Sequence, residues 1–388
     1  MDTQNTPVHI RLWHRDFWFL SIAGLLLSTV VYMWLSRVAS MLEPLSGMTS
    51  LERGGMVGIY GLGLFLLGPY CHYLIQRYRR NKVCILSVAA MALLAFAFGE
   101  IVPRTDGTER LVFGLVIMLW YGAFFGLAQM ILSGVLVLDV AESGQRTEAN
   151  YASAWFRRFA ICAGPLLAIV LPVESTMKVR GIVYVAVIVL LLLVKIPFKT
   201  PDGNEKLFSS DRFILSQGHW LAFNLLPVAA VLGMSVAMAF NNPIFFEQVA
   251  IGFAIALAAE KFVFADADLQ SEFISGGFCI IAALLMYVTR SGMPVVEHLA
   301  PSLIGIGTGL ISSRIQMFFI KLADHCQRGT AQNSFFLSWE FGFAIGIFLT
   351  GWLRDYHQLD VIGLIVILVS TIFYKAFTHN WYLKHRNR

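Results

Sequence analysis

Residues 182–194 read Ile182-Val-Tyr-Val-Ala-Val-Ile-Val-Leu-Leu-Leu-Leu-Val194, an unbroken run without a single charged side chain. Soon after it comes the longest polar stretch of the chain, Lys199-Thr-Pro-Asp-Gly-Asn-Glu-Lys-Leu-Phe-Ser-Ser-Asp-Arg212. A helix needs about 20 mainly apolar residues to cross the hydrocarbon core of a bilayer. Residues 179–197 therefore predict a membrane span, and the polar stretch after it predicts a linker near the middle of the chain.

The composition of the whole chain agrees with a membrane protein. Of the 388 residues, 57% are hydrophobic and only 14% are charged, whereas soluble domains carry about a quarter charged residues. These values exclude a soluble enzyme and a disordered chain. The formal net charge of +5 is explained by membrane topology, so we expect no nucleic-acid partner.

Motifs for metal, cofactor or enzyme chemistry are not apparent in the sequence. The five cysteines have no paired spacing of the kind that zinc sites and disulfide frameworks use. No glycine run is followed by the lysine of a nucleotide-binding loop, and no HExxH or serine-elbow pattern occurs. We therefore expect no metal, no cofactor, no direct drive by ATP and no enzyme activity.

Reading the rest of the chain by apolar length predicts twelve spans, which makes an all-α membrane protein. The first six are 16–37, 54–76, 82–101, 110–139, 149–172 and 179–197, and the second six are 217–240, 243–264, 271–289, 297–322, 330–352 and 359–377. The predicted domains are a six-helix bundle over 1–198, a cytoplasmic linker over 199–216 and a second six-helix bundle over 217–388.

The distribution of lysine and arginine predicts the orientation. With both termini inside, the cytoplasmic segments hold 17 of these residues and the outer loops hold 8. Because cytoplasmic loops are enriched in lysine and arginine, this bias favours twelve spans with cytoplasmic termini. We expect a multi-pass protein of the plasma membrane, in particular a bacterial inner membrane, with the lipid bilayer as its surroundings.

An internal repeat relates the two predicted halves. Trp155-Phe-Arg-Arg-Phe-Ala-Ile161 in span five matches Trp339-Glu-Phe-Gly-Phe-Ala-Ile345 in span eleven, 184 residues later. Just upstream, Arg146-Thr-Glu-Ala-Asn150 resembles Arg328-Gly-Thr-Ala-Gln-Asn333. Repeats of this kind predict two pseudo-symmetric bundles.

This outline, together with three local features, resembles the major facilitator superfamily over nearly the whole chain. A basic cluster, Arg77-Tyr-Arg-Arg-Asn-Lys82, lies between spans two and three, where that superfamily carries its best-known loop motif. Asp139 is similar to the acidic partner of that motif, and Gly164-Pro165 resembles part of an antiporter motif. The resemblance implies transport by alternating access, with conformational gating at Arg79, Arg80, Lys82 and Asp139. It also implies that spans three, six, nine and twelve face lipid while the others surround a cavity.

Four charged residues are expected deep in the spans that face this cavity: Arg157, Arg158, Arg314 and Glu340. From the rise of 1.5 Å per residue, Arg158 lies about 13 Å, Arg314 about 12 Å and Glu340 about 15 Å from the inner face. Alternating-access carriers bind their solutes near this depth. A charge there is costly, so it is paired or functional.

These charges predict a site for an anion. Arginine forks bind carboxylate or phosphate in a bidentate manner. Arg157 and Arg158 point about 100° apart on a helix, and we favour Arg158 as the one that faces the cavity. Glu340 is the only carboxylate expected deep in the cavity and could couple transport to a proton. Uniport, sodium coupling and exchange remain open, as does a purely structural Arg–Glu clamp between helices.

Other residues are weaker candidates for contact with a solute. Gln129 and Gln316 can hydrogen-bond a solute or a neighbouring helix. Trp155 and Trp339, at matching positions of the repeat, can form walls of a binding site or can pack in the core.

The sequence as a whole predicts a secondary transporter, acting as a monomer, for a small polar and anionic organic solute, with a proton or another coupling ion. The alternative within the same superfamily is a drug or metabolite efflux antiporter, in which aromatic residues matter more than arginines. A membrane enzyme or a receptor on a carrier fold is the third class, and no catalytic motif or appended domain favours it.

Overall fold

The computed structural model describes residues 11–43, 45, 47–196, 206–290 and 292–386, so the first part of the predicted linker, 199–205, lies outside the described residues. In the N-terminal half the α-helices are α1 (Arg15–Leu42), α2 (Ser50–Gly58), α3 (Tyr60–Gly63), α4 (Cys71–Arg77), α5 (Arg80–Ile101), α6 (Gly107–Ile131), α7 (Val137–Asp139), α8 (Arg146–Val170) and α9 (Val173–Leu193). In the C-terminal half they are α10 (His219–Met238), α11 (Pro243–Phe262), α12 (Ser271–Arg290), α13 (Pro294–Leu322), α14 (Arg328–Leu353), α15 (Tyr356–Phe373) and α16 (His379–His385).

Within this described part of the chain the helices form twelve units that are long and apolar enough to cross a membrane, which confirms the predicted number of spans. Most ends agree with the prediction to within a few residues. The last unit runs from Tyr356 to His385 and extends beyond the predicted end at residue 377, because a π-helical turn, Tyr374–Thr378, continues α15 into α16.

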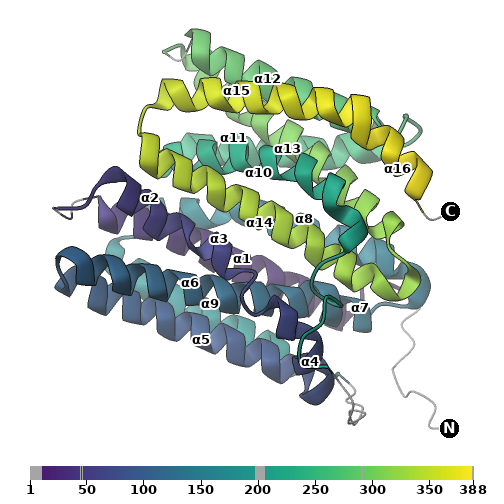
Figure 1. Ribbon diagram of the computed structural model, residues 1–388, viewed down its shortest axis with the longest axis horizontal. Helices are drawn as coiled ribbons and strands as arrows, with labels where there is room; N and C mark the ends of the chain where they lie inside the picture. Colours follow the sequence, from purple (N-terminus) through teal and green to yellow (C-terminus); the bar gives the residue numbers. More distant parts are fainter. Residues whose placement is uncertain (1–10, 44, 46, 197–205, 291, 387–388) are drawn as a thin grey trace.

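The two halves use the same pairings of helices. Helix α1 packs on α8 as α10 packs on α14, and α5 packs on α6 as α12 packs on α13. A short 3₁₀ turn precedes both repeated helices: Ser143–Gln145 leads into α8, and His325–Gln327 leads into α14. In Figure 1 the N-terminal half lies below the C-terminal half, with α8 and α14 in the middle. The repeat seen in the sequence is therefore a repeat of structure.

The predicted outer layer is also confirmed. Helices α12 and α15 form one edge of the molecule, and α5 and α9 lie at the opposite edge (Figure 1). Their outward faces are apolar: Leu86 and Leu93 are each 70% exposed, and Ile182 and Ile372 are each 66% exposed. Apolar surfaces this extensive suit lipid rather than water, so the chain is an integral, multi-pass membrane protein.

At one end of the bundle, the two halves touch where α2 meets α14. A Cβ atom added to Gly54 would lie 2.7 Å from the backbone oxygen of Phe348, and one added to Gly58 would lie 2.7 Å from the Cβ of Phe348. Glycine is required at these positions because any side chain would force the two helices apart. The sequence predicts this end to be extracellular.

At the other end, which the sequence predicts to be cytoplasmic, the described part of the linker joins the halves. The backbone N–H of Arg212 donates to Thr330 Oγ1 at 2.9 Å, and its guanidinium donates to the backbone oxygen of Gly134 at 3.2 Å. Thr330 belongs to α14, whereas Gly134 belongs to the fourth span. Ser143 and His325 add a side-chain hydrogen bond of 3.1 Å between the halves. Several polar contacts therefore close this end.

Candidate functional site

A small pocket lined by both charged and aromatic side chains lies in the centre of the bundle, between α1 and α8 of one half and α14 of the other. Its volume is about 20 Å³, which is room for about one water molecule. The residues that line it are Tyr32, Ala154, Arg157, Arg158, Phe335, Phe336, Trp339 and Glu340. Four of the eight are residues that the sequence singled out, so the structure brings both adjacent arginines together with Glu340 and Trp339.

Glu340 forms the acidic side of the central pocket. Its side chain is only 3% exposed, and Tyr32 Oη of α1 donates a 2.5 Å hydrogen bond to Glu340 Oε1. The second oxygen, Oε2, is buried and has no hydrogen-bond partner among the described residues. A buried carboxylate oxygen without a partner is costly, which leaves one position at Glu340 where a proton or a donor group would be stabilised.

Arg158 crosses from one half to the other. Its Nε donates to Ser312 Oγ at 2.8 Å, and its Nη2 donates to Gln316 Oε1 at 2.9 Å. Its guanidinium also lies 4.7 Å from the ring centroid of Trp155, which is a cation–π contact. Most of the bonding capacity of Arg158 is therefore used within the protein, although Nη1 is buried without a partner in the described structure.

Arg157 differs from its neighbour. It lines the central pocket and is partly buried, yet among the described residues it makes neither a hydrogen bond nor an ion pair. Its aliphatic stem passes beside Gly24 of α1. Arg158 was predicted to be the arginine that faces the cavity, whereas in the structure both arginines line the pocket. Of the two, Arg157 has all its N–H groups available for a ligand.

The two glutamines have different surroundings. Gln316 does not line the pocket itself, but its Nε2 donates to the backbone oxygen of Asn150 and to Gln332 Oε1, at 3.0 and 2.9 Å. It thereby holds Arg158 in place. Gln129 is fully buried within the N-terminal half and donates to Ser28 Oγ at 2.8 Å. Gln129 therefore forms a hydrogen bond between α6 and α1.

Contrary to the sequence expectation, Arg314 does not line the central pocket. It lies on the side of α13 that faces α12, where its guanidinium makes a bidentate ion pair with Glu272. Glu272 was not predicted as a partner because it is the second residue of α12. A charged residue at the end of a span is expected to lie at the membrane interface. With Arg314 neutralised there, the excess of positive charge at the centre is smaller than the sequence implied.

Glu260 is a second carboxylate between the halves that was not predicted from the sequence. This carboxylate near the end of α11 accepts hydrogen bonds from Tyr151 of α8 and Ser313 of α13. Glu340 is therefore not the only carboxylate between the halves. The contact of Tyr151 with Glu260 joins the N-terminal half to the C-terminal half on the side of the linker.

In the basic cluster between spans two and three, one residue pairs with the predicted acidic partner. Arg80 forms an ion pair with Asp139, at the end of the fourth span. Arg79 and Lys82 instead lie on the rim of a pocket on the side of the bundle. Their predicted role in gating stays a prediction.

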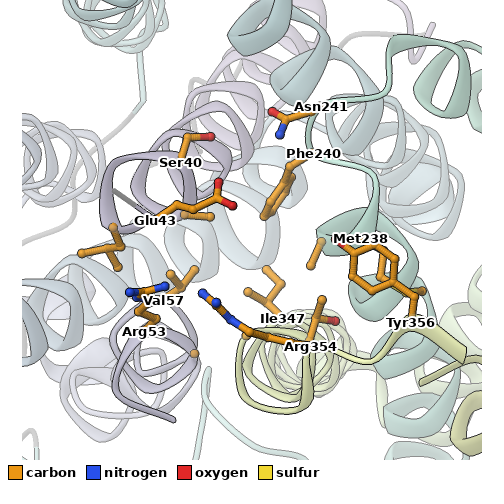
Figure 2. Close-up of a pocket in the computed structure, with 16 residues that line it drawn as sticks. Ser40, Glu43, Arg53, Val57, Met238, Phe240, Asn241, Ile347, Arg354 and Tyr356 are labelled. Carbon is orange, nitrogen blue, oxygen red and sulfur yellow. The ribbon is translucent and has the colours of Figure 1, made fainter. Parts of the chain in front are cut away.

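A larger cavity opens at the end of the bundle where α2 meets α14. Its volume is about 310 Å³, and it is lined from both halves by the ends of α1, α2, α10 and α14 and the start of α15. Figure 2 shows the side chains of Glu43, Arg53 and Arg354 around this vestibule, with Asn241 and Tyr356 on the side of the C-terminal half. The vestibule is therefore polar and carries charge from both halves.

The vestibule and the central pocket are lined by different residues. Along α14, Glu340 and Ile347 lie seven residues apart, which is about 10 Å; the first lines the pocket and the second lines the vestibule. Between them, Phe343 packs edge-on against Tyr32, with 5.2 Å between ring centroids. The centre is thus closed toward the vestibule by aromatic rings and toward the other end by polar contacts.

Comparison with solved structures identifies the architecture. The chain is similar to the crystal structure of the nucleoside transporter NupG (TM-score 0.65, 12% identity, 94% of this chain and 99% of that chain). It is also similar to a bacterial homologue of the iron transporter ferroportin in an outward-facing state (TM-score 0.62, 16% identity, 94% and 100%) and to the human organic anion transporter MFSD10 (TM-score 0.66, 14% identity, 92% and 98%). A scan of protein-family models and a comparison with curated protein sequences gave no match.

The chain therefore has the fold of the major facilitator superfamily transporters, over nearly its whole length. This agrees with the resemblance drawn from the basic cluster, the central linker and the two halves.

Proposed function

We propose that this protein is a secondary transporter that moves a small, polar, anionic organic solute across the membrane by alternating access. The fold is shared by proteins described as nucleoside, iron and organic anion transporters, so the fold itself does not select a solute. The choice of an anion rests on the side chains of the central pocket.

The observation that carries this proposal is the state of Arg157. It is a guanidinium at the centre of a membrane protein, beside a pocket that both halves line, and no described residue pairs with it. A charge in such a place costs at least about 2.5–3.5 kcal/mol on insertion scales and is retained where it has a function. A carboxylate or phosphate group would bind there through two parallel hydrogen bonds, and Arg158 Nη1 is available as a further donor.

The small volume of the pocket is that of an occluded conformation. An organic anion needs far more than 20 Å³, so the pocket must widen when the halves rotate apart. Opening toward the vestibule requires α2 to separate from α14 and Phe343 to move from Tyr32. Opening toward the other end requires the contacts of Arg212, and the pair Tyr151–Glu260, to break.

Glu340 is the proposed site of coupling. When it is ionised, it carries a negative charge next to Arg157 and competes with an anionic solute. When it is protonated, that competition ends, and Tyr32 can still hydrogen-bond it. Proton binding at Glu340 and anion binding at Arg157 would therefore favour one another, as proton–anion symport requires.

The experiment that tests the proposal is a thermal-shift screen of purified protein against anionic, neutral and cationic solutes, at pH 5.5 and 7.5. A solute at 100 times its dissociation constant stabilises the folded state by about 2.7 kcal/mol. We expect stabilisation by a few related anions, loss of that stabilisation in Arg157→Gln, and retention in Arg157→Lys at reduced affinity. Arg104→Gln serves as the control, because that side chain is exposed and pairs only with Glu100 near it in the chain.

The efflux alternative has one observation in its favour: Phe335, Phe336 and Trp339 supply much of the pocket wall. Stabilisation by lipophilic cations or neutral drugs, unchanged in Arg157→Gln, would select that alternative and reject the anion carrier.

A further inference from the structure

A groove on the lipid-facing side of the N-terminal half is separate from the central pocket in which we propose that the solute binds. It lies between the second, third and fourth spans, at the end of the bundle that the linker closes, and has a volume of about 560 Å³. The residues that line it are Leu67, Leu74, Arg77, Tyr78, Arg79, Lys82, Val83, Leu86, Ser87, Phe124 and Leu127. Two kinds of side chain dominate, apolar along the walls and basic at the rim.

The walls of the groove are apolar side chains from three spans. Leu86 of α5 is 70% exposed and stands beside the groove. A second cavity of about 420 Å³ shares Leu67 and Leu74 with the first and continues past Trp120. Apolar side chains therefore line both cavities on this side of the bundle.

The basic part belongs to the cluster Arg77–Lys82, of which only one residue is engaged by a protein carboxylate. That residue is Arg80, which pairs with Asp139. Arg77, Arg79 and Lys82 are exposed at the rim of the groove, and in the structure as described none of the three forms an ion pair with an acidic side chain. Arg77 only stacks over Tyr73, at 5.9 Å from the ring centroid.

We propose that this groove binds an anionic phospholipid. The headgroup phosphate lies between Arg77, Arg79 and Lys82, and one acyl chain lies along Leu67, Leu74 and Leu86. Three cations at the end of an apolar groove match the charge and shape of an anionic lipid in the adjacent leaflet, and basic pockets between spans bind such headgroups. A zwitterionic lipid fits the apolar part equally well but gains much less at the rim. The proposal does not depend on which solute the protein carries.

The test is native mass spectrometry of delipidated, detergent-purified protein, titrated with phosphatidylglycerol or with phosphatidylcholine of identical acyl chains. We expect wild-type protein to bind phosphatidylglycerol at least ten-fold more tightly. Each basic residue near an anionic lipid surface contributes about five-fold in affinity. The triple variant Arg77→Gln, Arg79→Gln, Lys82→Gln is therefore expected to lose about 100-fold for phosphatidylglycerol and little for phosphatidylcholine.

Two further variants separate the parts of the site. The triple variant Lys375→Gln, Lys384→Gln, Arg386→Gln removes three exposed cations at the other end of the chain and is expected to keep the preference for phosphatidylglycerol. Leu86→Trp fills the groove and is expected to weaken both lipids. Equal binding of the two lipids by wild-type protein, equal losses in the two triple variants, or displacement of phosphatidylglycerol by millimolar inorganic phosphate alone would overturn the proposal.

Discussion

Replacing Arg157 with glutamine removes a guanidinium that lines the central pocket and makes no hydrogen bond or ion pair with a described residue. If Arg157 binds the solute, the variant loses a charge-assisted hydrogen bond that contributes about 1.5–3 kcal/mol, which corresponds to an affinity about 10- to 150-fold weaker. Arg157 makes no hydrogen bond or ion pair with any described residue, but it lies beside Glu340 and offsets the charge of that carboxylate. The same change should therefore lower folding stability, but by less than Arg158→Gln does.

Arg158→Gln is the matched comparison, since it changes the adjacent residue in the same way. Arg158 donates to Ser312 and Gln316 at 2.8 and 2.9 Å. Each of these bonds to a charged donor is worth about 1.5–3 kcal/mol, so this variant should have a clearly lower melting temperature without any solute. The two variants are thus expected to differ: Arg157→Gln mainly weakens solute binding, and Arg158→Gln mainly lowers stability.

Both variants are measured by thermal shift in detergent, first without solute and then across a titration of the stabilising anion. The expected result for Arg157→Gln is a smaller fall in melting temperature than for Arg158→Gln, together with a much weaker titration. A fall in melting temperature as large as that of Arg158→Gln, measured without solute, would show that Arg157 has a structural role of the same size. A titration equal to that of wild type would show that the anion binds elsewhere, and either result would refute the reasoning.

Three further outcomes follow from the contacts between the halves. Glu340→Gln should abolish proton-driven accumulation in proteoliposomes and retain exchange of labelled for unlabelled solute; equal loss of both would remove Glu340 from coupling. Gly54→Val should lower the uptake rate by keeping α2 from α14, whereas Gly55→Val should not, because a Cβ there meets nothing within 4 Å. Cysteines in place of Ser143 and His325, whose side chains form a 3.1 Å hydrogen bond, should stop transport when joined by a short, reducible thiol cross-linker and restore it on reduction; transport by the cross-linked protein would show that this end need not open.

The spans could be predicted from sequence because they depend on length and composition, and the resemblance to the superfamily implied which of them face lipid. A run such as residues 182–194 must be helical and long in a bilayer, where backbone groups have no water to bond. The internal repeat around Trp155 and Trp339 also follows from sequence, since it requires only comparison of letters. These properties do not depend on how far a helix is rotated about its axis.

The partners of the deep charges could not be predicted in the same way. Whether Arg157 or Arg158 is free depends on the rotation of α8 relative to α13, which hydrophobic patterning leaves undetermined on a helix packed on several sides. Arg314 pairs with Glu272, which lies at the end of a span. Charged residues are common at the ends of spans, so the sequence does not mark this one as a partner. The role of Arg212 in joining the halves follows from the path of the linker, which composition does not specify.

The most direct test of the account is solute counterflow in proteoliposomes that contain only the purified protein. Liposomes loaded with an unlabelled anion identified by thermal shift are diluted into a trace of the same anion in labelled form. Alternating access at Arg157 predicts transient, saturable accumulation of label by wild-type protein, little by Arg157→Gln and none by protein-free liposomes. No counterflow of any anionic, neutral or cationic solute that binds, or full counterflow by Arg157→Gln, would contradict the central claim.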